Sequence, residues 1–482
     1  MKKRIIILIL SIVLCCCIYI NKINSPIKIT DEMLEEETEM ESAWDFYQNL
    51  NIGWNLGMSF SANIKYKELI KYEIVVDDYE SDMMECGNTN EIRLENPSNK
   101  IIQIAFDIPY SPLDGTLYWS IDELTLDDKI VLLNRKYESY VDKGKLIVDL
   151  VDLDYNEFRE ITIKISIVRF YEFNYTNKVN FYETFWCETK TTKELIKTLK
   201  EKGFNAVRIS FDVYNHINNE GIIDDLWINR LVEVVDYCME LEVYCLVDII
   251  ETYGLYADDL SLTSMNMFKL LWTQLANVFK EYDHKLLFSP FNELRNTKGD
   301  WNTSDIEILN NMNVLYQTFV DTIRATGGNN KYRNLILTTY AASISETILN
   351  KFVLPNDVSY NHLLVESHYY QPVNFTFNEI NLGTTDFTYE WGSGEDKKQL
   401  SDTFKLINKF MKNNKVPFII GEFGTVKRTD VSERIEYLSY YKELAKTYKV
   451  GLFIFDDAHD FIIIDRRDYK FIEEDLVNIL VK

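Results

Sequence analysis

Two patterns of hydrophobic and polar positions alternate along most of the chain. Stretches with apolar residues three and four positions apart, typical of amphipathic helices, cover residues 193–202, 226–241, 267–282 and 314–326. Short and mostly apolar runs, typical of strands buried on both faces, cover residues 51–57, 204–210, 243–249, 285–291, 334–340, 362–370, 416–423 and 450–457. From residue 191 onward the two kinds of segment follow one another in turn. The pattern therefore predicts eight strands alternating with helices.

Strands that alternate with helices form a parallel sheet. Eight such units favour a closed barrel over an open doubly wound sheet, whose glycine-rich phosphate loop is missing after the first strand. Polar and aromatic residues gather where the predicted strands end, which is the edge that carries the chemistry of such barrels. We predict an α/β fold, a (β/α)8 TIM barrel built from residues 43–60 and 181–482.

Residues 61–180 interrupt the pattern between the first strand and the first barrel helix. They contain β-like runs at 99–108, 116–122, 129–134, 145–151 and 159–170, separated by turn signals such as Asn96–Pro97 and Asp114–Gly115. A structureless loop of this length is rare in a compact domain. We predict an inserted β-sandwich-like domain in the first βα loop. Carbohydrate binding, spacing and partner docking all remain open as its role.

The N-terminus has the pattern of an export signal. Lys2, Lys3 and Arg4 precede an apolar run over residues 5–20, as in the charged and hydrophobic regions of a signal peptide. No clear small-residue cleavage site follows. Residues 1–24 are therefore predicted to be a cleaved signal peptide, a lipoprotein signal with a lipidated cysteine among Cys15, Cys16 and Cys17, or a membrane anchor. Residues 25–42 are acidic and typical of a solvated spacer. We expect an extracellular protein, secreted or attached to the cell surface.

The net charge and the cysteine content limit which binding partners, metals and cofactors are expected. The 482-residue chain has a formal net charge of −25, which argues against nucleic acid and anionic membrane surfaces and is compatible with a neutral substrate. The cysteines beyond the N-terminal segment form no CxxC pair, and no cluster has metal-ligand spacing. We predict no metal and no cofactor.

Two glutamates at strand ends match the requirements of glycosidic bond hydrolysis. Glu293 ends the fourth predicted strand and Glu422 the seventh, which lies nearly opposite in an eight-stranded ring. Such a reaction needs one carboxyl group to protonate the leaving oxygen and another to attack the anomeric carbon. A single glutamate at a strand end can equally be an exposed loop residue. The prediction therefore depends on the residues at the other strand ends that could orient the pair or bind sugar, which are Arg208, Asn292, His368 and Tyr370.

Six motifs in order resemble glycoside hydrolase family 5, the cellulase family. They cover residues 51–57, 203–210, 286–296, 316–343, 367–372 and 416–426. The resemblance implies that Asn292–Glu293 is the acid/base motif and that Glu422 is the nucleophile. It also implies supporting roles for Arg208, His368 and Tyr370, and it matches His216 to a histidine of the endoglucanase branch. The implied activity is retaining, endo-acting hydrolysis of β-1,4-glucan or a related plant polysaccharide, with β-glucan, xyloglucan and mannan as candidate substrates.

Three departures from the family pattern surround the expected sugar site. The usual His-His pair after the third strand is Ile250 and Glu251, the usual tryptophan after the eighth strand is Phe455, and the asparagine expected after residue 57 is Met58. Two hypotheses follow. Either the enzyme is active with a reshaped central subsite, in which Glu251 makes a polar contact, or the barrel is catalytically degenerate and serves as a surface carbohydrate-binding protein.

Tryptophans in predicted loops complete the candidate site. Trp186, Trp301 and Trp391 could pack on the C–H faces of sugar rings, or they could pack beneath their own loops. Together with His216, Glu251 and Phe455 they are the predicted substrate-binding residues.

Overall fold

The computed structural model describes residues 40–62, 175–377, 391–427 and 431–482, together with strand segments between residues 71 and 170. The predicted export segment and nearly all of the predicted spacer lie outside the described residues. Among the residues that are described, no helix combines the length and the apolar character needed to cross a membrane.

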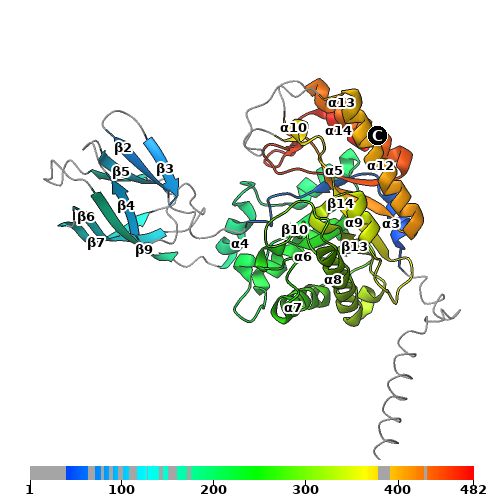
Figure 1. The fold of residues 1–482 in the computed structure, drawn as a ribbon, viewed down its shortest axis with the longest axis horizontal. Coiled ribbons are helices and arrows are strands. Elements are labelled where there is room, and N and C mark those ends of the chain that lie inside the picture. Colours follow the sequence, from blue (N-terminus) through cyan, green and yellow to red (C-terminus); the bar gives the residue numbers. More distant parts are fainter. Residues whose placement is uncertain are drawn as a thin grey trace, which may run out of the picture. The chain divides into compact units, whose positions relative to one another are not determined.

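Eight parallel strands form a closed barrel in chain order, which confirms the predicted TIM barrel (Figure 1). Seven of the eight observed strands lie within the run that predicted them, and β10 extends one residue beyond its run. The strands are β1 (Gly53–Asn55), β10 (Ala206–Phe211), β11 (Tyr244–Ile249), β12 (Leu286–Ser289), β13 (Leu335–Thr338), β14 (Leu363–His368), β15 (Phe418–Phe423) and β16 (Gly451–Ile454).

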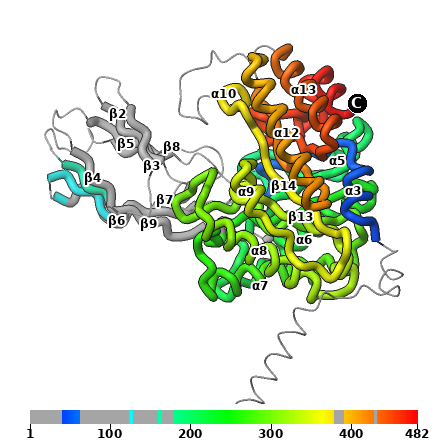
Figure 2. Tube along the Cα trace, turned by 45° about the vertical axis from the view of Figure 1, so that its right-hand side comes forward, coloured from blue at the N-terminus to red at the C-terminus, as the bar shows by residue number. Residues whose placement is uncertain are grey.

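Helices surround this barrel on its outer face. They are α5 (Lys193–Lys202), α6 (Asp225–Glu240), α7 (Leu262–Val278), α8 (Ile306–Ala325), α9 (Glu346–Lys351), α12 (Gly394–Asn414), α13 (Val431–Tyr448) and α14 (Glu474–Val481). Several begin at a side chain that accepts a backbone N–H of the first turn, as Thr192, Asp224 and Ser261 do. The first and last parts of the barrel meet where Asn51 donates to the carbonyl of Val481, and Figure 2 shows the blue N-terminal helix near the red C-terminal end.

The strands place alternate side chains on opposite sides of the barrel wall. The outward-facing residues, such as Val207 and Val247, form one large hydrophobic cluster with the surrounding helices. The inward-facing residues near the strand N-termini form a separate cluster that includes Ala206 and Tyr244. Helix α3 (Ala43–Asn49) contributes Phe46 to this inner cluster. The N-terminal end of the barrel is therefore filled and apolar, and the polar positions lie at the other end.

The inner positions are tightly filled. A Cβ atom on Gly53 would lie 2.0 Å from the ring of Phe453, and one on Gly421 would lie 1.8 Å from Oε1 of Glu366. Only glycine fits at these two positions, because the neighbouring side chain already occupies the space.

Eight antiparallel strands lie within the range of the predicted insert. They pair as two four-stranded sheets in the orders β3-β2-β5-β8 and β4-β9-β6-β7. Their bounds are β2 (Lys71–Val76), β3 (Ser81–Glu85), β4 (Glu91–Glu95), β5 (Ile101–Asp107), β6 (Leu117–Leu126), β7 (Lys129–Ser139), β8 (Lys145–Asp149) and β9 (Glu160–Phe170). The sequence pattern indicated the last five and missed the first three, of which β3 and β4 are short and largely polar. Helix α4 (Tyr175–Thr184) follows them in the chain.

Met58 has a left-handed backbone conformation, with φ of 66°. A left-handed conformation costs an ordinary residue roughly 1–2 kcal/mol, and asparagine tolerates it better than methionine does. We expect Met58→Asn to raise the free energy of unfolding by roughly 0.5–1 kcal/mol, measured by denaturant titration. Met239→Asn, inside α6, is the control and should lower it. A loss of stability in Met58→Asn would contradict this account.

Candidate active site

Arg208 lies at the centre of the polar end of the barrel. It stands on β10 with 1% of its surface exposed. Its Nη1 donates to Oε1 of Glu422 at 2.9 Å, and its Nη2 donates to Oδ1 of Asn292 at 2.9 Å. Its Nε lies 2.8 Å from Oε1 of Glu366, and its Nη2 lies 3.2 Å from Oδ2 of Asp248. One guanidinium therefore connects four strand ends across the barrel.

Glu366 and Asp248 are fully buried carboxylates that the sequence analysis did not single out. Burial alone would raise the pKa of Glu366, but the Arg208 charge and His368 lower it to about 2. Burial raises the pKa of Asp248 to about 7, although the Arg208 charge acts in the opposite direction. The signal that could have found them is a carboxylate inside an otherwise apolar strand, because such groups are rarely buried without a partner.

The two predicted catalytic glutamates face each other across this end of the barrel. One carboxylate oxygen of Glu293, one of Glu422 and a ring nitrogen of His368 all lie within 4.8 Å of one another. Nδ1 of His368 is 2.7 Å from Oε1 of Glu293 and 3.5 Å from Oε2 of Glu422. The hydroxyl of Tyr370 donates to Oε2 of Glu422 at 2.8 Å. Retaining glycosidases hold their carboxyl groups about 5–5.5 Å apart, and the upper limit of 4.8 Å between one oxygen of each glutamate is compatible with that arrangement.

The charges around the pair determine its protonation. Burial lowers the pKa of His368, but the Glu422 charge and the hydrogen bonds to Glu293 and Glu366 outweigh it and raise the pKa to about 10. His368 is therefore cationic near neutral pH and donates from Nδ1 to Glu293. Burial raises the pKa of Glu422 even though His368 and Arg208 favour its charged form. Arg208 thus limits a rise that burial would otherwise make larger.

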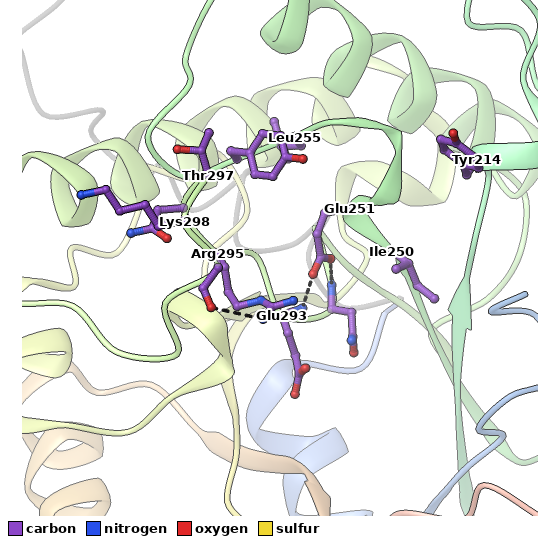
Figure 3. Close-up of a pocket in the computed structure, with 12 residues that line it drawn as sticks. Tyr214, Ile250, Glu251, Leu255, Glu293, Arg295, Thr297 and Lys298 are labelled. Carbon is purple, nitrogen blue, oxygen red and sulfur yellow. Dashed lines mark hydrogen bonds between the residues drawn. The ribbon is translucent and has the colours of Figure 1, made fainter. Parts of the chain in front are cut away.

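A cavity of about 550 Å³ opens beside Glu293 (Figure 3). Its lining includes Tyr214, Ile250, Glu251, Tyr256 and Arg295, which come from the loops after β10, β11 and β12. Tyr214 and Tyr256 are exposed at 42% and 41%. Open aromatic surface beside a carboxyl pair is a chemical setting suited to a carbohydrate chain.

A family model for cellulases, glycosyl hydrolase family 5, matches residues 171–457, which is more than half of the chain. The chain belongs to glycoside hydrolase family 5. The resemblance read from the six motifs is thereby confirmed, and the matched range contains both glutamates and the residues that contact them.

Endoglucanases are among the relatives. Endoglucanase B of Neocallimastix patriciarum is 32% identical over 311 residues, which cover 62% of this chain and 64% of the relative. Endoglucanase A of Clostridium longisporum is 32% identical over 280 residues, which cover 56% and 52%. The chain thus spans less than two thirds of the length of these curated relatives.

Solved structures of the family align with the barrel. A broad-specificity endoglucanase from Ruminococcus champanellensis with bound cellotriose is 32% identical, with a TM-score of 0.57, covering 63% of this chain and 89% of that one. A family 5 enzyme from Prevotella bryantii, in a mutant form bound to a xyloglucan tetradecasaccharide, is 33% identical, with a TM-score of 0.56, covering 63% and 89%.

His216 lies in the core and away from the open surface. It ends the short helix η4 (Tyr214–His216) and is 3% exposed. Its ring stacks on Trp227 with centroids 4.0 Å apart and makes an edge contact with Tyr182 at 4.5 Å. Aromatic rings contact the imidazole on two sides, and the binding of substrate by His216 remains a prediction.

Trp391 is also buried, with 6% of its surface exposed. It packs near Phe375, Tyr437 and Tyr440, with ring centroids 5.5–6.4 Å apart. Its role as a sugar platform remains a prediction. Trp186 and Trp301 remain accessible at 39% and 56%.

Phe455 belongs to an aromatic group beside Glu422. Its ring centroid is 6.2 Å from that of Tyr370 and 5.4 Å from that of Phe461. Phe461 and Phe377 also pack on Tyr370, at 5.8 and 5.1 Å. The sequence did not indicate Phe377 or Phe461, because neither lies in a recognisable motif. The group supports the ring whose hydroxyl binds Glu422.

Proposed function

We propose that this family 5 chain is a retaining, endo-acting O-glycosyl hydrolase that cleaves β-1,4-glucan or a related plant polysaccharide. The observation that carries the proposal is the arrangement of Glu293 and Glu422, with oxygens within 4.8 Å and with His368 between them. Arg208 and Tyr370 bind the two oxygens of Glu422 and so orient it as a nucleophile.

The geometry assigns a role to each group in a double displacement. His368 binds Oε1 of Glu293, so the other oxygen is left to carry the proton that passes to the leaving glycosidic oxygen. As that C–O bond breaks, Glu422 forms an ester with the anomeric carbon. Glu293 then takes a proton from water, which attacks the same carbon and releases Glu422, with net retention of configuration.

The substrate is proposed to be a neutral β-linked glucan chain. Relatives carry the names endoglucanase and broad-specificity endoglucanase, and one solved relative holds cellotriose. A xyloglucan oligosaccharide is bound to another, which makes branched glucan a second candidate beside mannan. In this chain the exposed rings of Tyr214, Tyr256 and Trp301 are the groups proposed to face the polymer.

The alternative of a degenerate, glycan-binding barrel is less well supported. Loss of catalysis would leave the contacts of the two glutamates without selection, yet Arg208, His368 and Tyr370 all hydrogen-bond to them. The departures at Ile250, Glu251 and Phe455 lie beside these contacts and do not break them.

We also propose a location for the protein and a role for the inserted domain. The charged and apolar pattern of residues 1–24 supports secretion or attachment to the cell surface, with membrane attachment through that segment as one form. The two four-stranded antiparallel sheets between β1 and α4 support a β-sandwich-like insert. Polysaccharide binding is the role we propose for it.

The test is reducing-sugar release by the wild-type protein from soluble β-glucan, xyloglucan and mannan, combined with NMR of the first anomer formed. We expect activity on at least one polymer and a β-configured first product, because two displacements at one carbon restore the configuration. An α-configured first product would contradict the double displacement. A folded protein that binds one polymer and hydrolyses none would favour the degenerate barrel.

A further inference from the structure

Glu251 makes an unusual contact with the acid/base segment. It follows β11 and begins the short helix η5 (Glu251–Tyr253). Its Oε1 accepts the backbone N–H of Glu293 at 3.1 Å, and its Oε2 accepts that of Asn292 at 3.2 Å. Figure 3 shows both bonds as dashed lines from Glu251. One carboxylate thus holds two consecutive amides of the segment that carries the proposed proton donor.

The strand register explains how this contact arises. β11 and β12 are parallel neighbours in which Asp248 pairs with Ser289. Glu251 and Asn292 each stand three residues beyond that pair, so the two chains leave the barrel side by side. A glutamate at this position is long enough to reach across to the backbone of the next strand end.

The contact needs both oxygens of an ionised carboxylate. Glutamine has an acceptor oxygen at only one of the two positions, because its other group is an NH2 donor. A protonated glutamate likewise has one oxygen that carries a hydrogen, so only its other oxygen is a good acceptor for an amide N–H. Hydrogen bonds from N–H groups to a charged oxygen are also about twice as strong as neutral ones. Two amide bonds of this kind restrict the backbone that positions Glu293.

The surroundings make the charge on Glu251 sensitive to pH. Burial raises its pKa to about 7, with further contributions from the Glu293 and Asp248 charges, while the backbone amides act in the opposite direction. Tyr253 is the other titratable group that interacts with it, and Arg295 lines the same cavity. Among the described residues no cation forms an ion pair with Glu251, so the two amides are its main stabilising partners.

We propose that Glu251 is a positioning residue that fixes the acid/base segment by accepting the amide hydrogens of both Asn292 and Glu293. This role goes beyond the sugar contact expected from the sequence, because each carboxylate oxygen accepts a backbone amide hydrogen. The proposal rests on the proposed hydrolase function for its kinetic consequences, whereas the anchoring itself is independent of activity.

Glu251→Gln is the kinetic test. We expect kcat to fall about 10-fold to 100-fold above pH 7, with KM changed less than about twofold, because the substituted residue misplaces Glu293 and touches no sugar. The ratio of wild-type to variant kcat should approach one below pH 6, where wild-type Glu251 is itself protonated. Glu201→Gln, an exposed carboxylate on α5, is the matched control and should leave the profile unchanged.

Hydrogen exchange gives a readout that does not depend on catalysis. At pH 8 the peptide containing Asn292 and Glu293 should exchange faster in Glu251→Gln than in the wild type or in Glu201→Gln. If the wild type is inactive on every polymer, the proposed function fails, but this measurement still tests the anchoring. If Glu251→Gln does not fold, Glu251→Asp keeps the charge and withdraws the oxygens by one methylene, so it should show the same faster exchange.

Two results would overturn the proposal. Unchanged exchange of this peptide in every folded variant would show that Glu251 does not hold the segment. A raised KM with wild-type kcat would assign Glu251 to sugar binding instead.

Discussion

Glu422→Ala is expected to lower kcat on the best soluble glucan by about 10⁴-fold or more. Without the carboxylate no ester with the anomeric carbon can form, and water has no equivalent group to replace it on that face. The substitution leaves Arg208 paired with Glu366 and Asp248, so the barrel should still fold. Reducing-sugar release measures the activity, and circular dichroism checks the fold.

Rescue by azide identifies the role of the missing group. In Glu422→Ala, azide can attack the anomeric carbon from the vacated side while Glu293 protonates the leaving oxygen. The C–O bond is replaced by a C–N bond, and the product is an α-glycosyl azide of inverted configuration. Glu293→Ala, assayed on an aryl β-glycoside whose phenolate leaves without a proton, should instead give a β-glycosyl azide, because the ester with Glu422 forms first and azide displaces it.

The control is Glu436→Ala, which removes an exposed glutamate from α13. It should keep wild-type activity. A fall of less than about tenfold in Glu422→Ala, or rescue with retained configuration, would remove Glu422 from the role of nucleophile.

The barrel and its reactive end were predictable because they depend on local patterns. Apolar runs between amphipathic segments fix strand order, and polar residues at strand ends meet at one edge whatever the details of packing. Glu293 and Glu422 could therefore be chosen from the sequence, and the structure brings an oxygen of each within 4.8 Å of the other.

Contacts that depend on register and on three-dimensional packing were not predictable. Glu251 was expected to touch sugar, and its contact with the backbone of the next strand end was not foreseen. His216 has the residue type of a site residue, but its ring stacks on Trp227 in the core. Such outcomes are decided by which side chain a neighbouring element brings close, and the linear pattern does not carry that information.

The partners of buried charged residues could not be predicted from the sequence either. Glu366 lies within a mostly apolar strand, where a buried carboxylate is unfavourable unless it is paired with a cation. Nε of Arg208, on β10, lies 2.8 Å from Oε1 of Glu366 and provides that cation. Arg208 itself was predicted as a supporting residue of the nucleophile. Its pairing with Glu366 and Asp248 adds a structural role, which leads to a second large effect.

Arg208→Met is expected to lower the free energy of unfolding at pH 7 by about 3–5 kcal/mol, because removing one partner of a buried ion pair leaves uncompensated charge. Glu366 and Asp248 would remain inside the barrel without the cation that faces them both. Methionine has a similar length, so little of the loss should come from an empty space. Denaturant titration measures it, and activity should be lost as well because Glu422 loses its Arg208 hydrogen bond.

The pH dependence of this loss separates charge from packing. In the wild type the pKa of Glu366 is lowered to about 2, so its ionised form stabilises the fold above the ordinary pKa of about 4.3, and this contribution is lost as the pH falls through 2. In Arg208→Met, Glu366 should instead take up its proton at a higher pH than in the unfolded chain, as Asp248, with a pKa of about 7, already does in the wild type. The stability difference between the two proteins should therefore shrink as the pH is lowered from 7 to about 4.

An exposed arginine provides the matched comparison. Arg467 pairs with Asp465 at the surface, and Arg467→Met should leave stability unchanged because solvent already screens that pair. If Arg208→Met cost the same amount at pH 4 and pH 7, the loss would come from packing alone. If it cost less than about 1 kcal/mol at both, the guanidinium would not be what holds the buried carboxylates in their charged form. A gap that is larger at pH 7 than at pH 4 is the result expected if this one cation faces the carboxylates on both β11 and β14.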